Sequence, residues 1–340
     1  MYSFETKISD IKQKILKDSE IIFSKHPEEK YRREPIDRIV KYPINNYIEF
    51  MVPLEESNSR LKLHTYMYLP DVNKEIRCVV YMLHGLSSHS NSFAHLAKKL
   101  AEKGCIVTAF DYRGHGLSEG KNGNIESWNT LVIDAKKFIE ETDEFLKKKF
   151  YDEKNKDSLN FLENRIVCGM SMGGLLTYFV TKDEPKKFHA IYLAACFGIT
   201  EPFYLKIIIR VLGTFCPNLK IPSPVGESEK YKNPANHEIK DPITIRGRFR
   251  TARELVNSLD LAKDEMKNSP YKNTFIMIIP GVDKIVPPLD QFDFFEKAES
   301  NDKEIVYYEN AWHSLYAEEE MFDISPKLCN WIEKQFPLKK

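Results

Sequence analysis

The sequence predicts an α/β fold, in which helices cover both faces of a mostly parallel sheet and a mainly helical cap is inserted. Short, continuous apolar runs such as Cys78–Leu83 are typical of strands buried on both faces of a parallel sheet. Stretches with apolar residues at helical spacing follow these runs, and alternation of this kind favours parallel pairing. The alternation stops between about Phe197 and Ser269 and resumes at Thr274, which places the cap between two core strands.

A leader and an antiparallel strand pair are expected first. Residues 1–45 are predicted as a leader, because residues 8–24 carry isoleucines near helical spacing and the following stretch is charged and interrupted by prolines. Tyr47–Val52 and Leu61–Leu69 alternate enough to form an antiparallel pair, with Glu55–Arg60 as the turn.

The remaining elements divide the chain into a core and a cap. The predicted buried strands are Cys78–Leu83, Cys105–Phe110, Arg165–Cys168, Ala190–Cys196, Thr274–Ile279 and Glu304–Tyr308. The predicted helices carry Phe93–Ala101, Trp128–Ile139, Leu175–Val180, Leu289–Ala298 and Pro326–Gln335. Tyr151–Asn164 is polar and lacks periodicity, so it is predicted to be an exposed insertion. These elements predict a core of residues 46–196 and 270–340 and a cap of residues 197–269.

The composition narrows the function classes. Lys plus Arg and Asp plus Glu each number 50, so a formal net charge of zero gives no general attraction to nucleic acid or an anionic membrane. The six cysteines have no C-x-x-C or metal-ligand spacing, which favours reduced thiols and a cytoplasmic setting. The first residues lack a signal-peptide pattern, and there is no run of 18 apolar residues. No metal or cofactor is expected, and the sequence predicts no oligomeric state.

A candidate nucleophile lies in Gly169-Met170-Ser171-Met172-Gly173-Gly174. An apolar strand precedes this G-x-S-x-G pattern and an apolar stretch suited to a helix follows it, as a nucleophile elbow requires. Side chains at the flanking glycines would collide with neighbouring backbone in so tight a turn, which leaves the Ser171 hydroxyl exposed above the sheet. The same pattern also occurs as a plain strand-to-helix turn.

An acid and a base follow in the order that such a serine needs. Asp283 comes directly after the predicted strand Thr274–Ile279, and His313 comes just after the next strand. Asp290 and Asp293 are rival acids, but both fall on the following helix rather than at the strand end. Of the nine histidines, His313 alone lies C-terminal to both the serine and the acid.

Two backbone N–H groups are predicted to form an oxyanion hole. One belongs to Met172, directly after the nucleophile, and the other to Leu86 in the turn His84-Gly85-Leu86 after an early strand. His84 and His115 precede the nucleophile in glycine-containing turns, and both are predicted to hold those loops rather than to act as the base.

Several motifs in one order resemble the monoglyceride lipase and lysophospholipase branch of the α/β-hydrolase superfamily, over about residues 45–335. They are His84-Gly85, His89-Ser90, the run Phe110-Asp-Tyr-Arg-Gly-His-Gly-Leu-Ser-Glu-Gly120, Gly169–Gly174, Gly281-Val282-Asp283 and Trp312-His313-Ser314-Leu315. The resemblance implies a cofactor-free serine esterase acting on monoacylglycerols or lysophospholipids. It also implies Ser171, Asp283 and His313 as the triad, with Leu86 and Met172 as oxyanion donors.

The sequence departs from this branch in three places, and other functions remain open. Met170 stands where monoglyceride lipases usually carry histidine, and the leader and the 151–164 insertion are additional. A short-chain carboxylesterase, an acyltransferase or an aminopeptidase-like amidase would keep the same site. The amidase would need cap acids to hold an amino group, and Glu201, Glu227 and Glu229 are available. A hydrolase-fold binding protein without turnover is the alternative from another class.

The cap is expected to set selectivity. Its most apolar stretch is Phe203–Phe215, which is interrupted by Lys206 and Arg210. One interpretation is a lid helix that lines an acyl-chain channel or makes transient contact with a membrane surface, in a protein that is otherwise cytoplasmic. The other is a helix that buries its apolar face on the core. The residues predicted to bind substrate are Phe203, Leu205, Ile208, Ile209 and Leu212.

Overall fold

The computed structural model describes residues 47–56, 59–71, 74–151, 158–200, 202–221 and 246–338. The predicted leader and the cap acids Glu201, Glu227 and Glu229 lie outside these residues. The strands are β1 (Tyr47–Glu56), β2 (Ser59–Tyr68), β3 (Cys78–Leu83), β4 (Cys105–Phe110), β5 (Arg165–Met170), β6 (Phe188–Leu193), β7 (Phe275–Pro280) and β8 (Lys303–Tyr308). The helices are α2 (Ala94–Glu102), α3 (Trp128–Phe150), α4 (Met172–Thr181), α5 (Phe203–Phe215), α7 (Phe249–Asn268), α8 (Pro288–Lys297) and α9 (Met321–Gln335).

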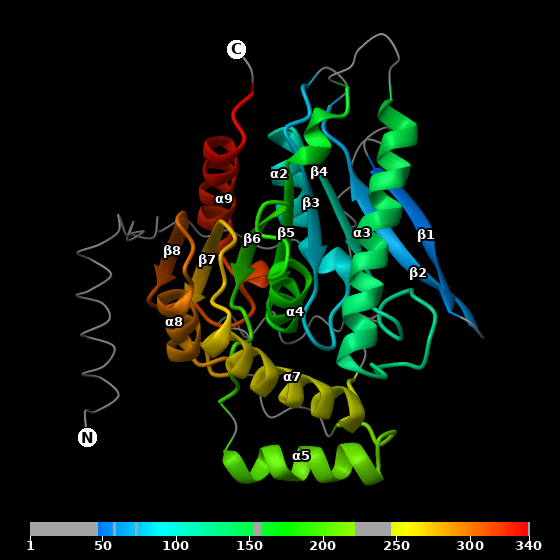
Figure 1. Cartoon of the computed structure of the whole chain (residues 1–340), viewed down its shortest axis with the longest axis vertical. Helices are drawn as coiled ribbons and strands as arrows, with labels where there is room; N and C mark the ends of the chain where they lie inside the picture. Colours follow the sequence, from blue (N-terminus) through cyan, green and yellow to red (C-terminus); the bar gives the residue numbers. More distant parts are fainter. Residues whose placement is uncertain are drawn as a thin grey trace.

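The described strands form one eight-stranded sheet, in the order β1-β2-β4-β3-β5-β6-β7-β8. β2 pairs antiparallel with β1 and β4, and every other pairing is parallel. The central strands are mostly apolar and almost wholly buried, as expected for strands that helices cover on both faces. The prediction of a mostly parallel sheet with helices on both sides is therefore confirmed (Figure 1).

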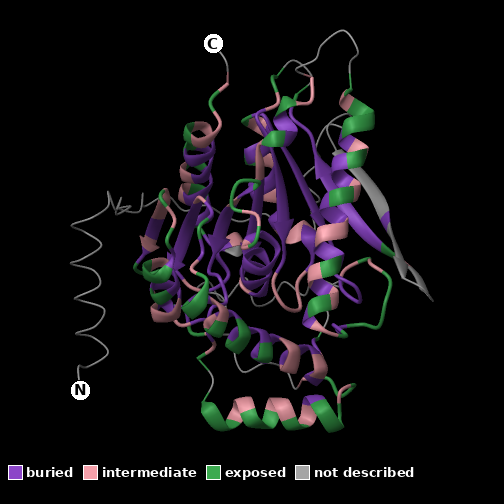
Figure 2. Cartoon of the chain, in the orientation of Figure 1, coloured by how far each residue is buried: buried purple, intermediate pink, exposed green. Residues whose placement is uncertain are grey.

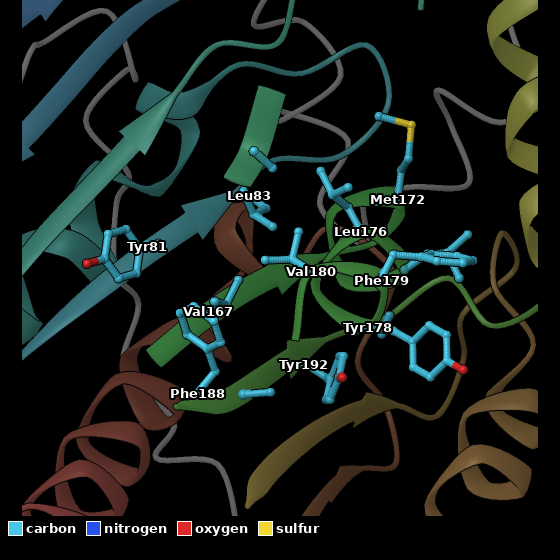
Figure 3. Close-up of a cluster of buried hydrophobic side chains, with 14 of the residues drawn as sticks. Tyr81, Leu83, Val167, Met172, Leu176, Tyr178, Phe179, Val180, Phe188 and Tyr192 are labelled. Carbon is cyan, nitrogen blue, oxygen red and sulfur yellow. The ribbon is translucent and has the colours of Figure 1, made fainter. Parts of the chain in front are cut away.

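Two apolar cores lie on opposite faces of the sheet. In β3, Val79, Tyr81 and Leu83 join the core under α3, α4 and α8, while Val80 and Met82 join the core under α2 and α9. This division follows from the two-residue period of a strand. Figure 3 shows the first core, in which apolar side chains of α4 meet those of β3, β5 and β6.

The two described helices of the predicted cap, α5 and α7, lie at one end of the sheet. α7 packs against α3 and α4, and α5 packs on the outside of α7 (Figure 1). Gly213 allows this approach, because a side-chain carbon there would lie 2.7 Å from the Phe249 carbonyl oxygen. The outward side of α5 is largely exposed (Figure 2). Among the described residues, no helix combines the length and apolar character needed to cross a membrane.

Two sequence-based expectations are wrong in part. Within the predicted exposed insertion 151–164, residues 160–163 form a short 3₁₀ helix whose Phe161 and Leu162 are buried. A short segment with so few apolar residues has too little periodicity to reveal that these side chains are buried. The last helix begins at Met321 rather than near Pro326. Proline is most often found in the first turn of a helix, but Pro326 lies inside this one.

Candidate active site

Ser171 lies in the sharp turn between β5 and α4. Its φ of 53° and ψ of −122° are unusual for a residue with a side chain. The turn can be this tight because a side-chain carbon at Gly169 would lie 2.1 Å from the Gly173 carbonyl oxygen, and one at Gly173 would lie 2.0 Å from the Leu83 carbonyl oxygen. The strand-turn-helix context predicted for this motif is therefore present.

His313 and Asp283 lie beside Ser171 in a continuous chain of hydrogen bonds. His313 Nε2 is 2.9 Å from Ser171 Oγ, and His313 Nδ1 is 2.7 Å from Asp283 Oδ2. The other carboxylate oxygen, Asp283 Oδ1, accepts the backbone N–H groups of Ile285 and Val286 at 2.8 and 2.9 Å. These two donors fix the carboxylate so that Oδ2 faces the imidazole.

The partners of His313 define the tautomer of its ring. Nδ1 faces a carboxylate, which only accepts hydrogen bonds, so the ring proton is on Nδ1 and Nε2 offers a lone pair to the Ser171 hydroxyl. His313 is 5% exposed and Asp283 is 7% exposed, so bulk water competes little for these bonds. The arrangement allows proton transfer from the serine to the histidine.

The turn that carries Leu86, one of the two predicted oxyanion donors, lies against Ser171. A side-chain carbon at Gly85 would lie 3.3 Å from Ser171 Cβ and 3.8 Å from Ser171 Oγ, so glycine allows the backbone to approach here. Leu86 follows Gly85 in this turn, and Met172 is the first residue of α4 on the other side of Ser171. The residues that carry the two predicted donors therefore lie next to the Ser171 turn, Leu86 directly after Gly85 and Met172 directly after Ser171.

His84 stabilises this turn through hydrogen bonds, in agreement with the structural role predicted for it. Its Nδ1 donates to the Gly85 carbonyl oxygen at 2.8 Å, and its Nε2 accepts the Tyr112 N–H at 3.1 Å. The ring also stacks on Tyr112. Burial, followed by the nearby His115, lowers the pKa of His84 from 6.5 to about 3, so the ring is neutral. His115 Nδ1 lies 3.2 Å from the Arg113 carbonyl oxygen within its own loop.

Asp111 is a further site residue, for which the sequence predicted no role. One of its oxygens accepts the backbone N–H and the hydroxyl of Ser90, and the other accepts the Leu117 N–H. Burial alone would raise the pKa of Asp111, but the bonds from His64, Leu117 and Ser90 together with the nearby His84 hold it well below its usual value. The available signal was its position directly after β4, at the sheet edge that also carries Ser171.

Several other residues named from sequence lie outside this group. Asp290 pairs with Lys263 and Asp293 with Lys297, so neither rival acid belongs to the chain of hydrogen bonds. Met170 is buried in the core under α2 and α9.

The five predicted substrate-binding residues on α5 are not joined to the Ser171 group, because α7 lies between α5 and the sheet (Figure 1). Phe203 and Ile208 are exposed, and Leu205, Ile209 and Leu212 are half-buried. The described residues contain no cluster of three or more histidine, cysteine or acidic side chains suited to a metal ion.

Comparison with solved structures gives the same fold. A soluble variant of monoglyceride lipase from Saccharomyces cerevisiae, in complex with a substrate analogue, superposes with a TM-score of 0.72 at 18% identity, covering 88% of this chain and 99% of that one. The monoacylglycerol lipase of Paleococcus ferrophilus superposes with a TM-score of 0.66 at 23% identity, covering 80% of this chain and 98% of that one. Both similarities show the α/β-hydrolase fold.

Sequence comparison assigns the family. Human monoglyceride lipase is 23% identical over 250 residues, which cover 71% of this chain and 77% of that protein. The sequence profile described as "Serine aminopeptidase, S33" matches residues 74–320, a stretch that includes the Ser171, Asp283 and His313 group. The chain therefore belongs to the serine aminopeptidase S33 family of hydrolases.

Proposed function

We propose that this protein is a serine ester hydrolase that cleaves monoacylglycerols or lysophospholipids through an acyl-enzyme on Ser171. The observation that carries the proposal is the hydrogen-bonded chain from Ser171 through His313 to Asp283. The named activities of the relatives, which are lipases of monoacylglycerols, support a lipid ester as the substrate. The proposed reaction needs no cofactor.

The first half of the proposed reaction forms the acyl-enzyme. His313 Nε2 takes the proton of the Ser171 hydroxyl as its oxygen attacks the ester carbonyl carbon, and Asp283 stabilises the imidazolium that results. The N–H groups of Leu86 and Met172 bind the negative oxygen of the tetrahedral intermediate. The intermediate collapses when the C–O bond to the alcohol breaks, and His313 returns the proton to the departing glycerol or glycerophospho group.

The second half regenerates the free serine. Water gives a proton to His313 Nε2 and adds to the acyl carbonyl carbon, which forms a second tetrahedral intermediate in the same oxyanion hole. Its collapse breaks the bond to Ser171 Oγ, which recovers its proton from the imidazolium. The fatty acid then leaves.

The cap helix α5 supports a lipid substrate through its outward face. The exposed apolar residues on this face are Phe203, Tyr204, Ile207, Ile208, Val211 and Phe215. Their spacing of three to four residues makes one continuous stripe, as in helices that lie in a membrane interface. The proposed role of this stripe is transient contact with a membrane surface. All six cysteines are free thiols, which supports a cytoplasmic setting.

Replacing the nucleophile tests the triad. Ser171→Ala is expected to lower kcat by up to about 10⁶, because a serine nucleophile acts as a unit with its base. It should also abolish covalent labelling by a fluorophosphonate probe. Ser325→Ala is the control, since Ser325 is a buried serine in α9 whose hydroxyl bonds the Met321 carbonyl oxygen, away from the Ser171 group. Retained turnover in folded Ser171→Ala would exclude the assignment.

A substrate panel tests the lipid assignment separately. Rates on monoacylglycerols, lysophospholipids and p-nitrophenyl esters of rising chain length are expected to increase with acyl length, because each buried methylene contributes about 0.8 kcal/mol. Rates that collapse beyond short acyl chains would contradict a lipid substrate and leave the triad in place. Hydrolysis of aminoacyl amides in preference to esters would favour the aminopeptidase-like alternative.

Cosedimentation with phosphatidylcholine vesicles tests the membrane contact. Phe203→Ser together with Phe215→Ser is expected to lower the bound fraction at least about tenfold, because these side chains are 74% and 80% exposed and would enter the interface. Leu261→Ser on α7 is the control, as an exposed apolar residue outside the stripe. Equal binding by all three proteins would rule out docking through α5.

A further inference from the structure

Ser87 has an unusual backbone conformation directly beside a proposed oxyanion donor. It follows Leu86, and its φ of +60° lies in the left-handed region. That region costs a residue with a side chain on the order of 1 kcal/mol, and glycine adopts it freely. A serine held here requires compensating contacts.

Such a contact comes from the cap. Ser87 Oγ accepts the backbone N–H of Gly247 at 3.3 Å, across a sequence separation of 160 residues. Gly247 belongs to residues 246–251, which lead into and begin α7 and are called the return segment below. A side-chain carbon at Gly247 would lie only 3.3 Å from Leu86 Cδ1, so the backbone of the return segment also packs against Leu86.

The return segment has a second anchor on the core. The Arg248 N–H donates to the Gly123 carbonyl oxygen at 3.0 Å, and Thr251 Oγ1 donates to the same oxygen at 2.8 Å. Thr251 Oγ1 also accepts the Ile125 N–H at 2.8 Å. The segment is therefore tied to the 123–125 loop at one point and to the turn of Leu86 and Ser87 at another.

We propose that Ser87 is a positioning residue that couples the oxyanion hole to the seating of the cap's return segment. The proposal rests on the function proposed above, in which the Leu86 N–H binds the oxyanion. When the return segment is seated, the bond from Gly247 holds Ser87 and so directs the preceding peptide toward Ser171. When the segment shifts, this bond is lost and the donor is misplaced. The effect falls on the tetrahedral state, in which the negative oxygen exists, rather than on substrate binding.

Ser87→Gly separates this role from a merely structural one. Glycine accepts the left-handed conformation and removes only the hydroxyl, so the protein is expected to fold with a melting temperature close to that of the wild type. On a soluble short-chain ester, kcat should fall about tenfold with KM unchanged, since a displaced donor loses part of the effect of one that is removed. The inhibition constant of a trifluoromethyl ketone, which forms a tetrahedral adduct with serine, should rise by the same factor. Unchanged kcat and unchanged inhibition in Ser87→Gly would overturn the proposal.

A double-mutant cycle tests the coupling to the return segment. Thr251→Val removes the hydroxyl that anchors the segment on the 123–125 loop, and Thr251 has no bond to the oxyanion turn. It is expected to lower kcat about threefold in the wild type and by clearly less in Ser87→Gly, because the hydrogen bond to Ser87 is already lost there and only the packing of Gly247 on Leu86 remains. Independent, multiplying effects of the two substitutions would overturn the coupling.

Wild-type protein distinguishes this proposal from the function on which it rests. A fluorophosphonate label on Ser171, together with ester turnover, establishes the proposed function before any variant is compared. If wild-type protein takes no label, the proposed function fails and the coupling fails with it. If wild-type protein is labelled and active while Ser87→Gly equals it in kcat and inhibition, only the coupling fails.

Discussion

Residues at the carboxyl ends of the strands make up the group around Ser171, and their partners come from distant parts of the chain. Ser171 and His313 are 142 residues apart, and His313 and Asp283 are 30 apart. Each side chain does one thing in the arrangement: Ser171 presents a hydroxyl, His313 a lone pair and Asp283 a fixed carboxylate. His84 supports the neighbouring turn in its neutral form, which has a consequence for pH dependence.

Stability is expected to fall in mild acid through His84. The folded state holds its pKa near 3 and the unfolded state returns it to 6.5, so unfolding takes up a proton below pH 6.5. The stabilisation by neutral His84 is present above pH 6.5 and is lost as the pH falls toward 3. His84→Asn cannot take up this proton, so its unfolding free energy in urea should fall less steeply between pH 6.5 and 5, by up to about 1.4 kcal/mol per pH unit. Equal slopes in the two proteins would contradict a neutral, buried His84.

The sequence predicts the main residues of the site because their positions follow from local rules. A serine in a G-x-S-x-G turn, and an acid and a histidine after later strands, can each be located from the strand that precedes it. The position of Asp111 directly after β4 placed it at this sheet edge, but neither its role nor that of Ser87 could be assigned from the sequence. Their roles depend on His64 and Gly247, which lie far away in the chain and have no sequence pattern that links them.

Among the elements, α5 differs most from a buried core helix, because many of its apolar side chains are exposed. The apolar stretch Phe203–Phe215 left two interpretations open, because an apolar stripe is the same whether it faces protein, lipid or a ligand. In the structure, part of the apolar surface of α5 faces α7 and part faces outward (Figure 2). The interface between the two helices depends on the close approach at Gly213.

Gly213→Ala is expected to loosen α5 from α7. The added carbon would lie 2.5 Å from Arg253 Cβ and 2.7 Å from the Phe249 carbonyl oxygen, so the helices must separate. Amide hydrogen exchange in α5 should become faster, even though alanine favours an isolated helix by about 1 kcal/mol over glycine. Val211→Ala, at a 48% exposed position of the same helix, should leave exchange nearly unchanged. Slower exchange in Gly213→Ala would show that propensity outweighs the packing.

For the whole molecule, strand and helix order is predictable because the hydrophobic period changes from two to 3.6 residues between elements. β3 and β4 begin and end at the predicted residues, since both are continuous apolar runs bounded by polar or glycine residues. The burial of Phe161 and Leu162 was not predictable, because it depends on tertiary packing beside Phe150. The same limit applies to the ion pairs that join separate parts of the core.

The buried Arg113–Asp134 ion pair joins the loop after β4 to α3. The guanidinium Nε and Nη2 donate to the two carboxylate oxygens at 2.6 and 2.7 Å, and the side chains are 3% and 1% exposed. Asp134→Asn should cost about 3–5 kcal/mol of unfolding free energy in urea, because a buried cation loses its closest counter-charge. Arg113→Met combined with Asp134→Leu should recover most of this loss. A double variant as unstable as Asp134→Asn would mean that packing, not the unpaired charge, sets the cost.

The strand order also determines when parts of the sheet can form during synthesis of the chain. From β5 to β8, each parallel strand is laid down beside the one made before it, so the sheet can grow outward as the chain leaves the ribosome. The elbow of Ser171 forms with β5, but His313 follows only after β8, 142 residues later. A nascent chain therefore carries its serine without a partner base through that interval. The chemistry proposed for Ser171 therefore requires β8, the last of the described strands, to be in place.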